Sequence, residues 1–270
     1  MTMKLADRIV LITGASSGFG MDAARIFARE GSVVVLAARR LDRLTELAGE
    51  IQAAGGQAFP MPLDVTEQAQ IDEAVQTCLE RFGRIDVLFN NAGFGRLGWL
   101  ETLDPAADID AQIDVNLRGV IQMARAVLPS MLAQRSGTII NMSSVAGRIA
   151  APLYTIYAAT KFGVRGFTDA LRRETAPFGV RVCGIYPGAA TTEFSLHTRN
   201  SQARTKLKTP KFIHMTSEYV ARKVVSLAKH PRRAVILPWW MLPPLWFDLY
   251  TPGLVDWFLK VAFVKRSHHL

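Results

Sequence analysis

Cysteine is scarce in this sequence, since only Cys78 and Cys183 occur among 270 residues. Two cysteines cannot form a disulfide framework, and neither has the neighbouring histidines or cysteines that a zinc site requires. A disulfide-rich module and a zinc module are therefore excluded, and we expect a cytoplasmic protein that binds no metal. The opening residues MTMKLADRIVLITG contain charges too early for a signal peptide, which agrees with that expectation.

The sequence also lacks a convincing membrane-spanning segment. Residues 234–247 form a stretch of fourteen residues without a charge, whereas a spanning helix needs about 20 apolar residues. Three prolines, Pro238, Pro243 and Pro244, interrupt this stretch. With 49% hydrophobic and 20% charged residues, the chain has too much apolar side chain to be disordered. The composition is that of one globular domain.

An acidic excess is absent, and the positive charge is confined to one segment. The formal net charge is +9, yet residues 1–193 hold 19 Lys and Arg against 20 Asp and Glu. Residues 194–233 hold 10 against 1 and account for the whole excess. The aromatic residues follow this basic run and do not interleave with it, so we expect no nucleic-acid partner. The basic run is either a solvated loop or a surface for an anionic partner.

Short β-branched stretches alternate with longer amphipathic stretches over the first two-thirds of the chain. The expected strands are 9–13, 33–36, 87–89, 138–141, 180–185 and 234–237, and the expected helices are 21–30, 41–54, 67–82, 110–134 and 158–177. Such alternation predicts an α/β domain with a parallel sheet covered by helices on both faces. We assign this domain to residues 1–237 and an apolar, Trp-rich extension to residues 238–270.

A glycine-rich turn follows the first expected strand. Gly14, Gly18 and Gly20 have the spacing G-x-x-x-G-x-G, with Ser16 and Ser17 between them, and a helix starts directly afterwards. Glycines let the backbone approach a pyrophosphate, and the free N–H groups at a helix N-terminus favour its negative charge. The turn therefore indicates a dinucleotide cofactor.

The second expected strand ends in Arg39 and Arg40. An NAD-specific enzyme places an acid here to bind the ribose 2′-hydroxyl, whereas two guanidiniums suit a 2′-phosphate. The sequence therefore favours NADP(H) over NAD(H), although these arginines would also suit a solvated helix start. Because cells usually keep NADPH reduced, this preference favours reduction as the physiological direction.

Tyr157 and Lys161 are four residues apart on an expected helix, so the ammonium can reach the neighbourhood of the phenol. A nearby cation favours phenolate, and we therefore expect a lowered pKa for Tyr157. Ser144 follows an expected strand, thirteen residues before Tyr157. A phenol tuned in this way can exchange a proton with a substrate oxygen.

Together these residues resemble the short-chain dehydrogenase/reductase family over residues 7–190. The matching motifs are Thr13-Gly-x-x-x-Gly-x-Gly20, Leu63-Asp64-Val, Asn90-Asn-Ala-Gly93, Val115-Asn116, Ser144 with Tyr157 and Lys161, and Pro187-Gly188. The resemblance implies a doubly wound Rossmann fold with a mostly parallel, seven-stranded sheet. It also implies a substrate lid at residues 194–216 and a homodimer or homotetramer that packs through residues 110–134 and 158–177.

The resemblance implies four catalytic residues. Tyr157 would be the general acid/base, and Ser144 would hold the substrate oxygen by a hydrogen bond. Lys161 would lower the pKa of Tyr157 and bind the nicotinamide ribose. Asn116 would position a proton relay through a water. Ser143 is adjacent to Ser144, but the family spacing of thirteen residues to the tyrosine selects Ser144.

The resemblance also implies an NADP(H) site. Asp64 would contact the adenine, Asn90 would brace the cofactor side of the sheet, and Thr192 would meet the nicotinamide carboxamide. The whole cofactor-binding set is Gly14, Ser16, Ser17, Gly18, Gly20, Arg39, Arg40, Asp64, Asn90, Tyr157, Lys161, Pro187, Gly188 and Thr192.

Apolar residues flank the reacting centre in the sequence, and they include Phe94, Leu97, Trp99, Ile149, Leu153, Tyr154 and Phe194. Such a wall predicts a large apolar carbonyl or alcohol substrate, such as a steroid, retinoid or lipid-like ketone. A 3-oxoacyl thioester on an acyl carrier is the alternative, with the basic run as its docking site. A non-catalytic NADPH sensor is disfavoured because Tyr157 and Lys161 are both present.

Four of the five tryptophans lie in the last 32 residues, at positions 239, 240, 246 and 257. Leu254, Trp257, Phe258 and Val261 recur at helical spacing. Tryptophan beside basic residues is typical of a membrane interface. The same rings could instead cover the substrate pocket or a subunit interface, so peripheral membrane contact and packing both stay open.

Overall fold

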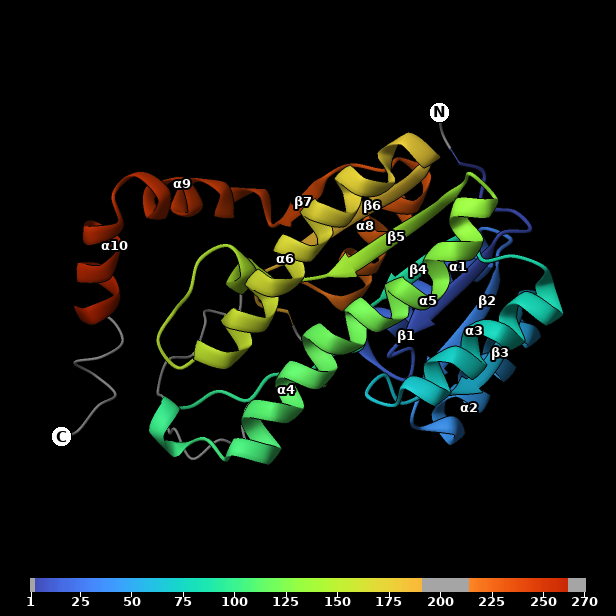
Figure 1. Cartoon of the computed structure of the whole chain (residues 1–270), viewed down its shortest axis with the longest axis horizontal. Helices are drawn as coiled ribbons and strands as arrows, with labels where there is room; N and C mark the ends of the chain where they lie inside the picture. The colour runs from blue at the N-terminus through green and yellow to red at the C-terminus, as the bar shows by residue number, and fades with distance from the viewer. Residues whose placement is uncertain (1–2, 191–213, 262–270) are drawn as a thin grey trace.

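Seven parallel strands form one sheet in the order β3-β2-β1-β4-β5-β6-β7 (Figure 1). The computed structural model describes residues 3–190 and 214–261. The strands are β1 Ile9–Thr13, β2 Val33–Ala38, β3 Gln57–Pro62, β4 Val87–Asn90, β5 Gly137–Met142, β6 Val180–Pro187 and β7 Ala234–Leu237. The α/β Rossmann fold predicted from the sequence is therefore confirmed. Thr192 and most of the predicted lid, residues 194–213, lie outside the described residues.

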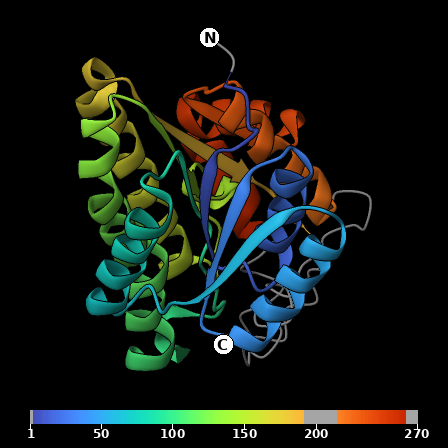
Figure 2. The same ribbon diagram turned by 90° about the vertical axis from the view of Figure 1, so that its right-hand side faces the viewer.

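Helices cover both faces of the sheet (Figure 2). One layer consists of α1 Gly18–Arg29, α2 Leu41–Ala53 and α8 Ser217–Lys229. The other consists of α3 Gln68–Phe82, α5 Gly119–Ala133 and α6 Thr155–Thr175. This covering explains why the strands read as continuous apolar runs, since every residue of β1 is buried.

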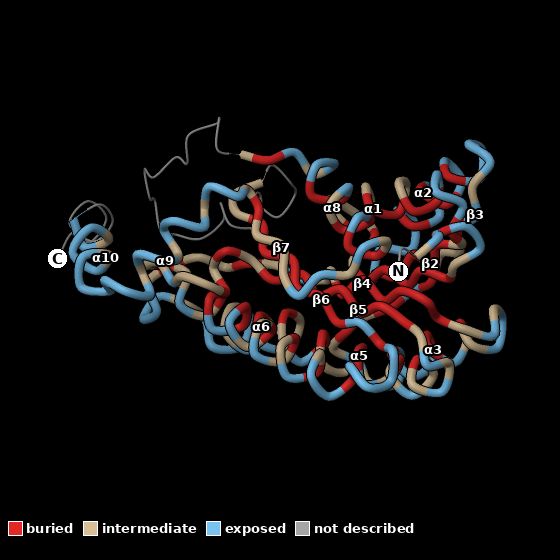
Figure 3. Tube along the Cα trace, turned by 90° about the horizontal axis from the view of Figure 1, so that it is seen from above, coloured by how far each residue is buried: buried red, intermediate tan, exposed pale blue. Residues whose placement is uncertain are grey.

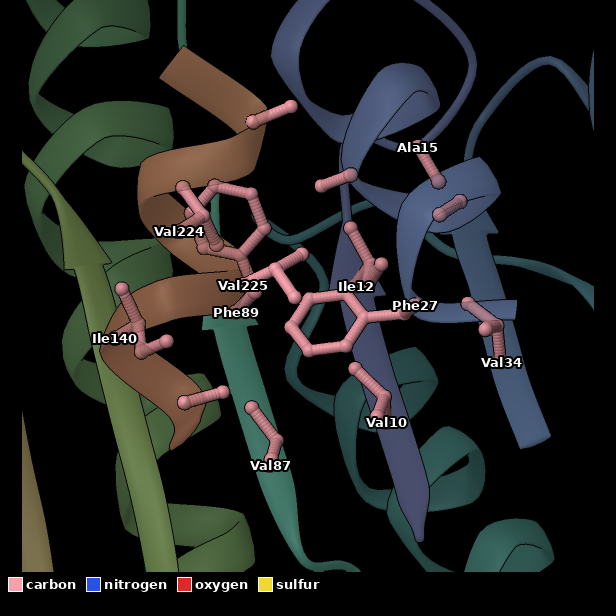
Figure 4. Close-up of a cluster of buried hydrophobic side chains, with 14 of the residues drawn as sticks. Val10, Ile12, Ala15, Phe27, Val34, Val87, Phe89, Ile140, Val224 and Val225 are labelled. Carbon is pink, nitrogen blue, oxygen red and sulfur yellow. The ribbon is translucent and has the colours of Figure 1, made fainter. Parts of the chain in front are cut away.

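The hydrophobic core is divided by the sheet into two clusters. In one cluster, Phe27 of α1 lies with Ile12 of β1 and Val224 of α8 (Figure 4). The other cluster lies on the opposite face and contains residues of α3 and α5. Cys183 belongs to the first cluster and Cys78 to the second, and both thiols are free.

The strand order reverses direction between β1 and β4. From β1 the chain first builds β2 and β3 on one side, and then β4 to β7 on the other. The helices that follow β1 and β4 therefore lie on opposite faces of the sheet. In open α/β sheets, ligands bind at such a switch point.

β3 is a strand that the local sequence pattern did not indicate, because Pro60 and Pro62 lie within it. It occupies the edge of the sheet and pairs with β2 alone. Proline cannot donate a ladder hydrogen bond, but at an edge the missing donor can face away from the sheet. Leu63 N donates to Ala38 O at 3.0 Å, so odd-numbered N–H groups of this segment point to β2.

The helix expected over residues 110–134 is longer and less regular than predicted. It begins with π-helical turns at η2 Pro105–Asp110, continues through α4 Ala111–Ile113 and a second π-helical segment, η3 Asp114–Arg118, and ends as α5. Such wide turns occur often at functional sites, and the second one contains Asn116. Short 3₁₀ turns lie elsewhere, at η1 Leu100–Thr102, η4 Val145–Gly147, η5 Ala176–Phe178 and η7 Trp239–Met241.

The chain after β7 forms two helices that project from the body of the molecule, α9 Leu242–Tyr250 and α10 Pro252–Leu259 (Figure 1). Pro243 and Pro244 do not interrupt a helix, because they lie in the first turn of α9, where no N–H donor is needed. No residue of either helix is buried (Figure 3). Among the described residues, no helix is long and apolar enough to cross a membrane.

Candidate active site

The glycine-rich turn joins β1 to α1 at the switch point of the sheet. Gly14 has a φ of 64°, and a Cβ atom at this position would lie 2.8 Å from Ala92 Cα. A Cβ atom at Gly20 would lie 2.5 Å from Gly14 O. Only glycine therefore allows the turn to fold so closely against the start of α1 and the loop after β4.

Asn91 fixes this turn from the neighbouring strand. Its Nδ2 donates to Thr13 O and Gly14 O, both at 3.1 Å, and its backbone N donates to Thr13 Oγ1 at 3.0 Å. Asn91 was not predicted as a site residue, although it follows Asn90 in the segment Asn90-Asn-Ala-Gly93. The structure places it as the residue that joins the β1 and β4 loops.

The N-terminus of α1 is electrostatically suited to a phosphate. Ser17 is the N-cap residue, but its side chain makes no capping hydrogen bond, and the first turn contains no acidic residue. The helix dipole adds partial positive charge at this end. Backbone N–H groups and positive potential thus meet where a pyrophosphate would lie.

Arg40 lies over the glycine-rich turn. Its Nε and Nη2 donate to Ser16 Oγ at 3.3 and 3.1 Å. The neighbouring Arg39 is 76% exposed, with its Nη1 3.9 Å from Asp64 Oδ2. Asp64 also accepts from Thr66 N at 3.0 Å and from Thr66 Oγ1 at 2.8 Å. Both predicted 2′-phosphate ligands therefore lie at the carboxyl end of β2, beside the turn.

Ser144 and Tyr157 meet at the carboxyl end of β5. Ser144 Oγ accepts from Ala146 N at 3.1 Å and donates to Pro187 O at 3.3 Å. Its side chain is also hydrogen-bonded to that of Tyr157, which lies in the first turns of α6. Ser143 instead points into the core and donates to Lys161 O at 3.0 Å. Of the two adjacent serines, only Ser144 has a hydrogen bond to the tyrosine.

Lys161 follows Tyr157 by one turn of α6 and is almost fully buried. Its Nζ donates to Met142 O at 3.1 Å and lies 5.6 Å from the centroid of the Tyr157 ring. Burial lowers the pKa of Lys161 to about 8.

The pKa of Tyr157 is raised, in the direction opposite to the one expected from the sequence. The main cause is desolvation of the buried phenol. The hydrogen bond with Ser144 lowers the pKa of Tyr157, and the nearby Tyr154 raises it further. The rings of Tyr154 and Tyr157 pack edge to face, with centroids 6.2 Å apart. Tyr154 therefore forms part of the wall around the phenol, as the sequence suggested.

Asn116 lies behind Lys161, within the second π-helical segment. Its Oδ1 accepts from Phe94 N at 2.9 Å, and its Nδ2 donates to Phe94 O at 2.8 Å. A Cβ atom on Gly93 would lie 2.9 Å from Asn116 Oδ1 and 3.5 Å from Lys161 Nζ. Asn116 and Lys161 are therefore close neighbours, with Gly93 between them.

Asn90 lies inside the sheet, away from solvent. Its Nδ2 donates to Asn141 Oδ1 at 2.9 Å and to Val120 O at 3.3 Å, and Asn141 Nδ2 donates to Thr168 Oγ1 at 2.9 Å. These contacts form a buried hydrogen-bond network from β4 through β5 to α6. The network fixes α6, which carries Tyr157 and Lys161, against the sheet.

Pro187 and Gly188 lie at the end of β6, where Gly188 N donates to Leu237 O at 2.8 Å. With these two residues, all the predicted site residues except Thr192 are described. They lie near the carboxyl ends of the strands, and Asn90, the last residue of β4, is buried there. No cluster of three or more His, Cys, Asp or Glu suited to a metal ion occurs within residues 3–190 and 214–261.

Comparison with known proteins adds two relatives of known activity. The chain is 40% identical over 190 residues to the 3-oxoacyl-acyl-carrier-protein reductase of Thermotoga maritima, which covers 70% of this chain and 77% of that protein. It is 38% identical over 191 residues to a 3-ketodihydrosphingosine reductase of Bacteroides thetaiotaomicron, which covers 71% of this chain and 67% of that protein.

Two solved structures are also similar. An alcohol dehydrogenase of Thermococcus sibiricus, complexed with 5-hydroxy-NADP, has 31% identity and a TM-score of 0.76, covering 85% of this chain and 95% of its own. A short-chain dehydrogenase/reductase of Burkholderia phymatum, in complex with NAD, has 26% identity and a TM-score of 0.83, and the match covers 94% of this chain and 96% of that chain. The family model of the short chain dehydrogenases matches residues 8–203. The chain therefore belongs to the short-chain dehydrogenase/reductase family and is an oxidoreductase.

Proposed function

We propose that this protein reduces an apolar ketone or aldehyde with NADPH, and that Tyr157 donates the proton. The observation that carries the proposal is the hydrogen-bonded pair of Ser144 and Tyr157, with Lys161 one helical turn further. This group lies at the same sheet edge as the glycine-rich turn, so a dinucleotide held by the turn can extend toward it.

The residues of the site fit such a dinucleotide. The turn around Gly14 and Gly20 has no space for side chains, and the uncapped N-terminus of α1 supplies N–H donors. Bound NADPH would supply the hydride that is added to the carbonyl carbon. Arg39 and Arg40 favour its 2′-phosphate, since the carboxyl end of β2 itself carries no acid.

Tyr157 is a neutral phenol at physiological pH, because burial raises its pKa. It can therefore donate its proton to the carbonyl oxygen as negative charge develops there. Ser144 stabilises the same oxygen by a hydrogen bond. Lys161 binds the ribose and stabilises the phenolate that remains. Asn116 positions a water-mediated relay through which Tyr157 regains its proton.

The substrate class follows from the walls of the site. The ring of Tyr154 packs against that of Tyr157, and the backbone of Phe94 is hydrogen-bonded to Asn116. Leu153, next to Tyr154, is buried. A lipid-like ketone suits such walls, and one relative is a 3-ketodihydrosphingosine reductase. A 3-oxoacyl thioester on an acyl carrier is the second candidate, supported by the relative from Thermotoga maritima and by the positive charge of residues 194–233.

The first experiment follows NADPH oxidation by absorbance with a steroid ketone, a retinal, a long-chain 3-ketolipid and a 3-oxoacyl thioester. Tyr157→Phe should lose about 10²- to 10⁴-fold in kcat, which is the usual contribution of a general acid, and should still bind NADPH. Tyr154→Phe is the matched control, since it keeps the ring and leaves Tyr157 in place. Equal turnover by wild type and Tyr157→Phe would contradict the proposed role. Tight NADPH binding without turnover of any substrate would favour a sensor.

A further inference from the structure

Exposed apolar surface is concentrated at the end of the described chain. Seventeen large hydrophobic side chains are exposed within residues 3–190 and 214–261, and eleven of them lie in residues 239–261. We call residues 239–261 the C-terminal helical pair. Its exposed members are Trp239, Trp240, Leu242, Trp246, Phe247, Leu249, Tyr250, Leu254, Trp257, Phe258 and Val261. A concentration of exposed apolar side chains is typical of an interaction surface.

We propose that the C-terminal helical pair docks on the surface of a phospholipid bilayer. Neither helix can span the bilayer, since α9 and α10 contain nine and eight residues. They would instead lie in the plane of the interface, with their aromatic side chains at headgroup depth.

The distribution of side chains around the two helices favours a bilayer over a second protein. Only Leu245 and Asp248 of α9, and Val255 and Leu259 of α10, are half-buried, and all other residues of both helices are exposed. A partner subunit would cover one side of each helix and leave the remaining aromatic rings in water. A lipid interface surrounds a helix over a wide arc and covers them together.

The residue types point in the same direction. Trp239 is 74% exposed, and Trp246 stacks on Tyr250 with ring centroids 5.6 Å apart. Tryptophan and tyrosine have an apolar body and a polar tip, and they gather at the boundary between hydrocarbon and headgroups. Asp256 of α10 and the C-cap residue Lys260 are four apart and lie on the same side of the helix.

Charge supports an anionic bilayer as the preferred surface. The C-terminal helical pair itself has only Asp248, Asp256 and Lys260, so its attachment rests on apolar burial. The chain as a whole has a formal net charge of +9, and a positively charged protein is attracted to anionic headgroups. We therefore expect binding to neutral vesicles, strengthened by anionic lipid and partly reversed by salt.

The position of the pair connects docking to the proposed reaction. It starts directly after β7, whose last residue Leu237 accepts a hydrogen bond from Gly188 at the edge of the candidate active site. A water-insoluble ketone could therefore enter the site from the bilayer without crossing bulk water. This last step rests on the proposed function, whereas docking itself does not.

The test is co-sedimentation of the full-length protein with vesicles of phosphatidylcholine, alone or mixed with phosphatidylglycerol. The variant W246S/W257S is compared with F178S/Y219S, which removes two exposed aromatic residues from the body of the molecule. We expect the partition coefficient to fall by about tenfold or more in the first variant and to stay unchanged in the second. Tryptophan emission of the wild type should shift to the blue with vesicles.

NADPH binding, the thermal unfolding midpoint and the molar mass are measured for the wild type and both variants. NADPH binding and the thermal unfolding midpoint establish that both variants are folded, and they need no turnover. If neither the wild type nor the variants sediment with vesicles, the docking proposal is wrong. It is also wrong if both variants lose vesicle binding to the same extent. A lower molar mass of W246S/W257S in analytical ultracentrifugation, without vesicle binding by the wild type, would assign the surface to a second copy of this chain.

Discussion

Lys161 is the residue at which burial has the clearest chemical consequence. Lys161 is 3% exposed, and its ammonium donates to one backbone carbonyl, Met142 O, so little compensates for the water that it has lost. The folded protein therefore holds the Lys161 proton less tightly than the unfolded chain does, with a pKa of about 8 against an ordinary 10.5. This desolvation destabilises the folded protein at the position where the amine of Lys161 can contact a ribose.

Stability should consequently depend on pH through Lys161. Below pH 8 both states carry the proton and the full cost is present, whereas between pH 8 and 10.5 the unfolded chain binds more protons. Relative to Lys161→Met, the wild type should gain about 2 kcal/mol between pH 7.5 and 10. Urea unfolding of both proteins across this range measures the difference. Parallel curves would show that Lys161 is not desolvated.

Arg40 offers a second test at this scale. A charge-assisted contact with a 2′-phosphate contributes about 1.5–3 kcal/mol. Arg40→Ala should therefore raise the KM for NADPH by about 10- to 100-fold and leave the KM for NADH unchanged. Arg222→Ala is the control, because Arg222 is exposed on α8 and ion-paired with Glu218. A loss with both cofactors would mean that Arg40 supports the loop rather than selecting the phosphate.

Among the elements, β4, β5 and α6 are held together by the buried hydrogen-bond network Asn90–Asn141–Thr168. All three residues are at most 1% exposed, so bulk water does not reach their polar groups. The network therefore fixes the register at which α6 presents Tyr157 to the end of β5.

Asn141→Leu keeps the volume of the side chain and removes both hydrogen bonds. It should lower the free energy of unfolding by about 1–3 kcal/mol, because polar groups of Asn90 and Thr168 lose a buried partner. Thr138→Val on the same strand is the matched control. Thr138 Oγ1 is buried without a hydrogen-bond partner, so that change should be neutral or stabilising. Denaturant midpoints compare the two, and equal losses would refute a specific role for the network.

Elements could be predicted from the sequence where one local rule dominates. β1 and β7 have the predicted bounds, because a buried parallel strand has a continuous apolar run. β3 could not be predicted locally, since the tolerance of its prolines depends on its place at the sheet edge. The π-helical turns around Asn116 also have no local signature. The motifs identified the site residues, but the direction of the Tyr157 pKa depends on burial, which a motif does not contain.

At the scale of the whole molecule, the C-terminal helical pair packs little against the body, which comprises residues 3–190 and 214–238. No residue of η7, α9 or α10 is buried, so these elements contribute little to the core. A chain that ends at Pro238 should therefore keep its unfolding free energy within about 0.5 kcal/mol, as do most changes at exposed positions. Thermal and urea unfolding check this expectation. A loss of several kcal/mol would mean that the extension packs on the body.

The free edge of β3 has a consequence for the behaviour of the protein at high concentration. Its outward-facing backbone groups belong to residues 58, 60 and 62, because the odd-numbered N–H groups point to β2. Pro60 and Pro62 have no N–H, and Ala58 O already accepts from Gln52 Nε2 at 3.1 Å. Little remains there for another strand to pair with. This side of the sheet is thereby protected against edge-to-edge aggregation.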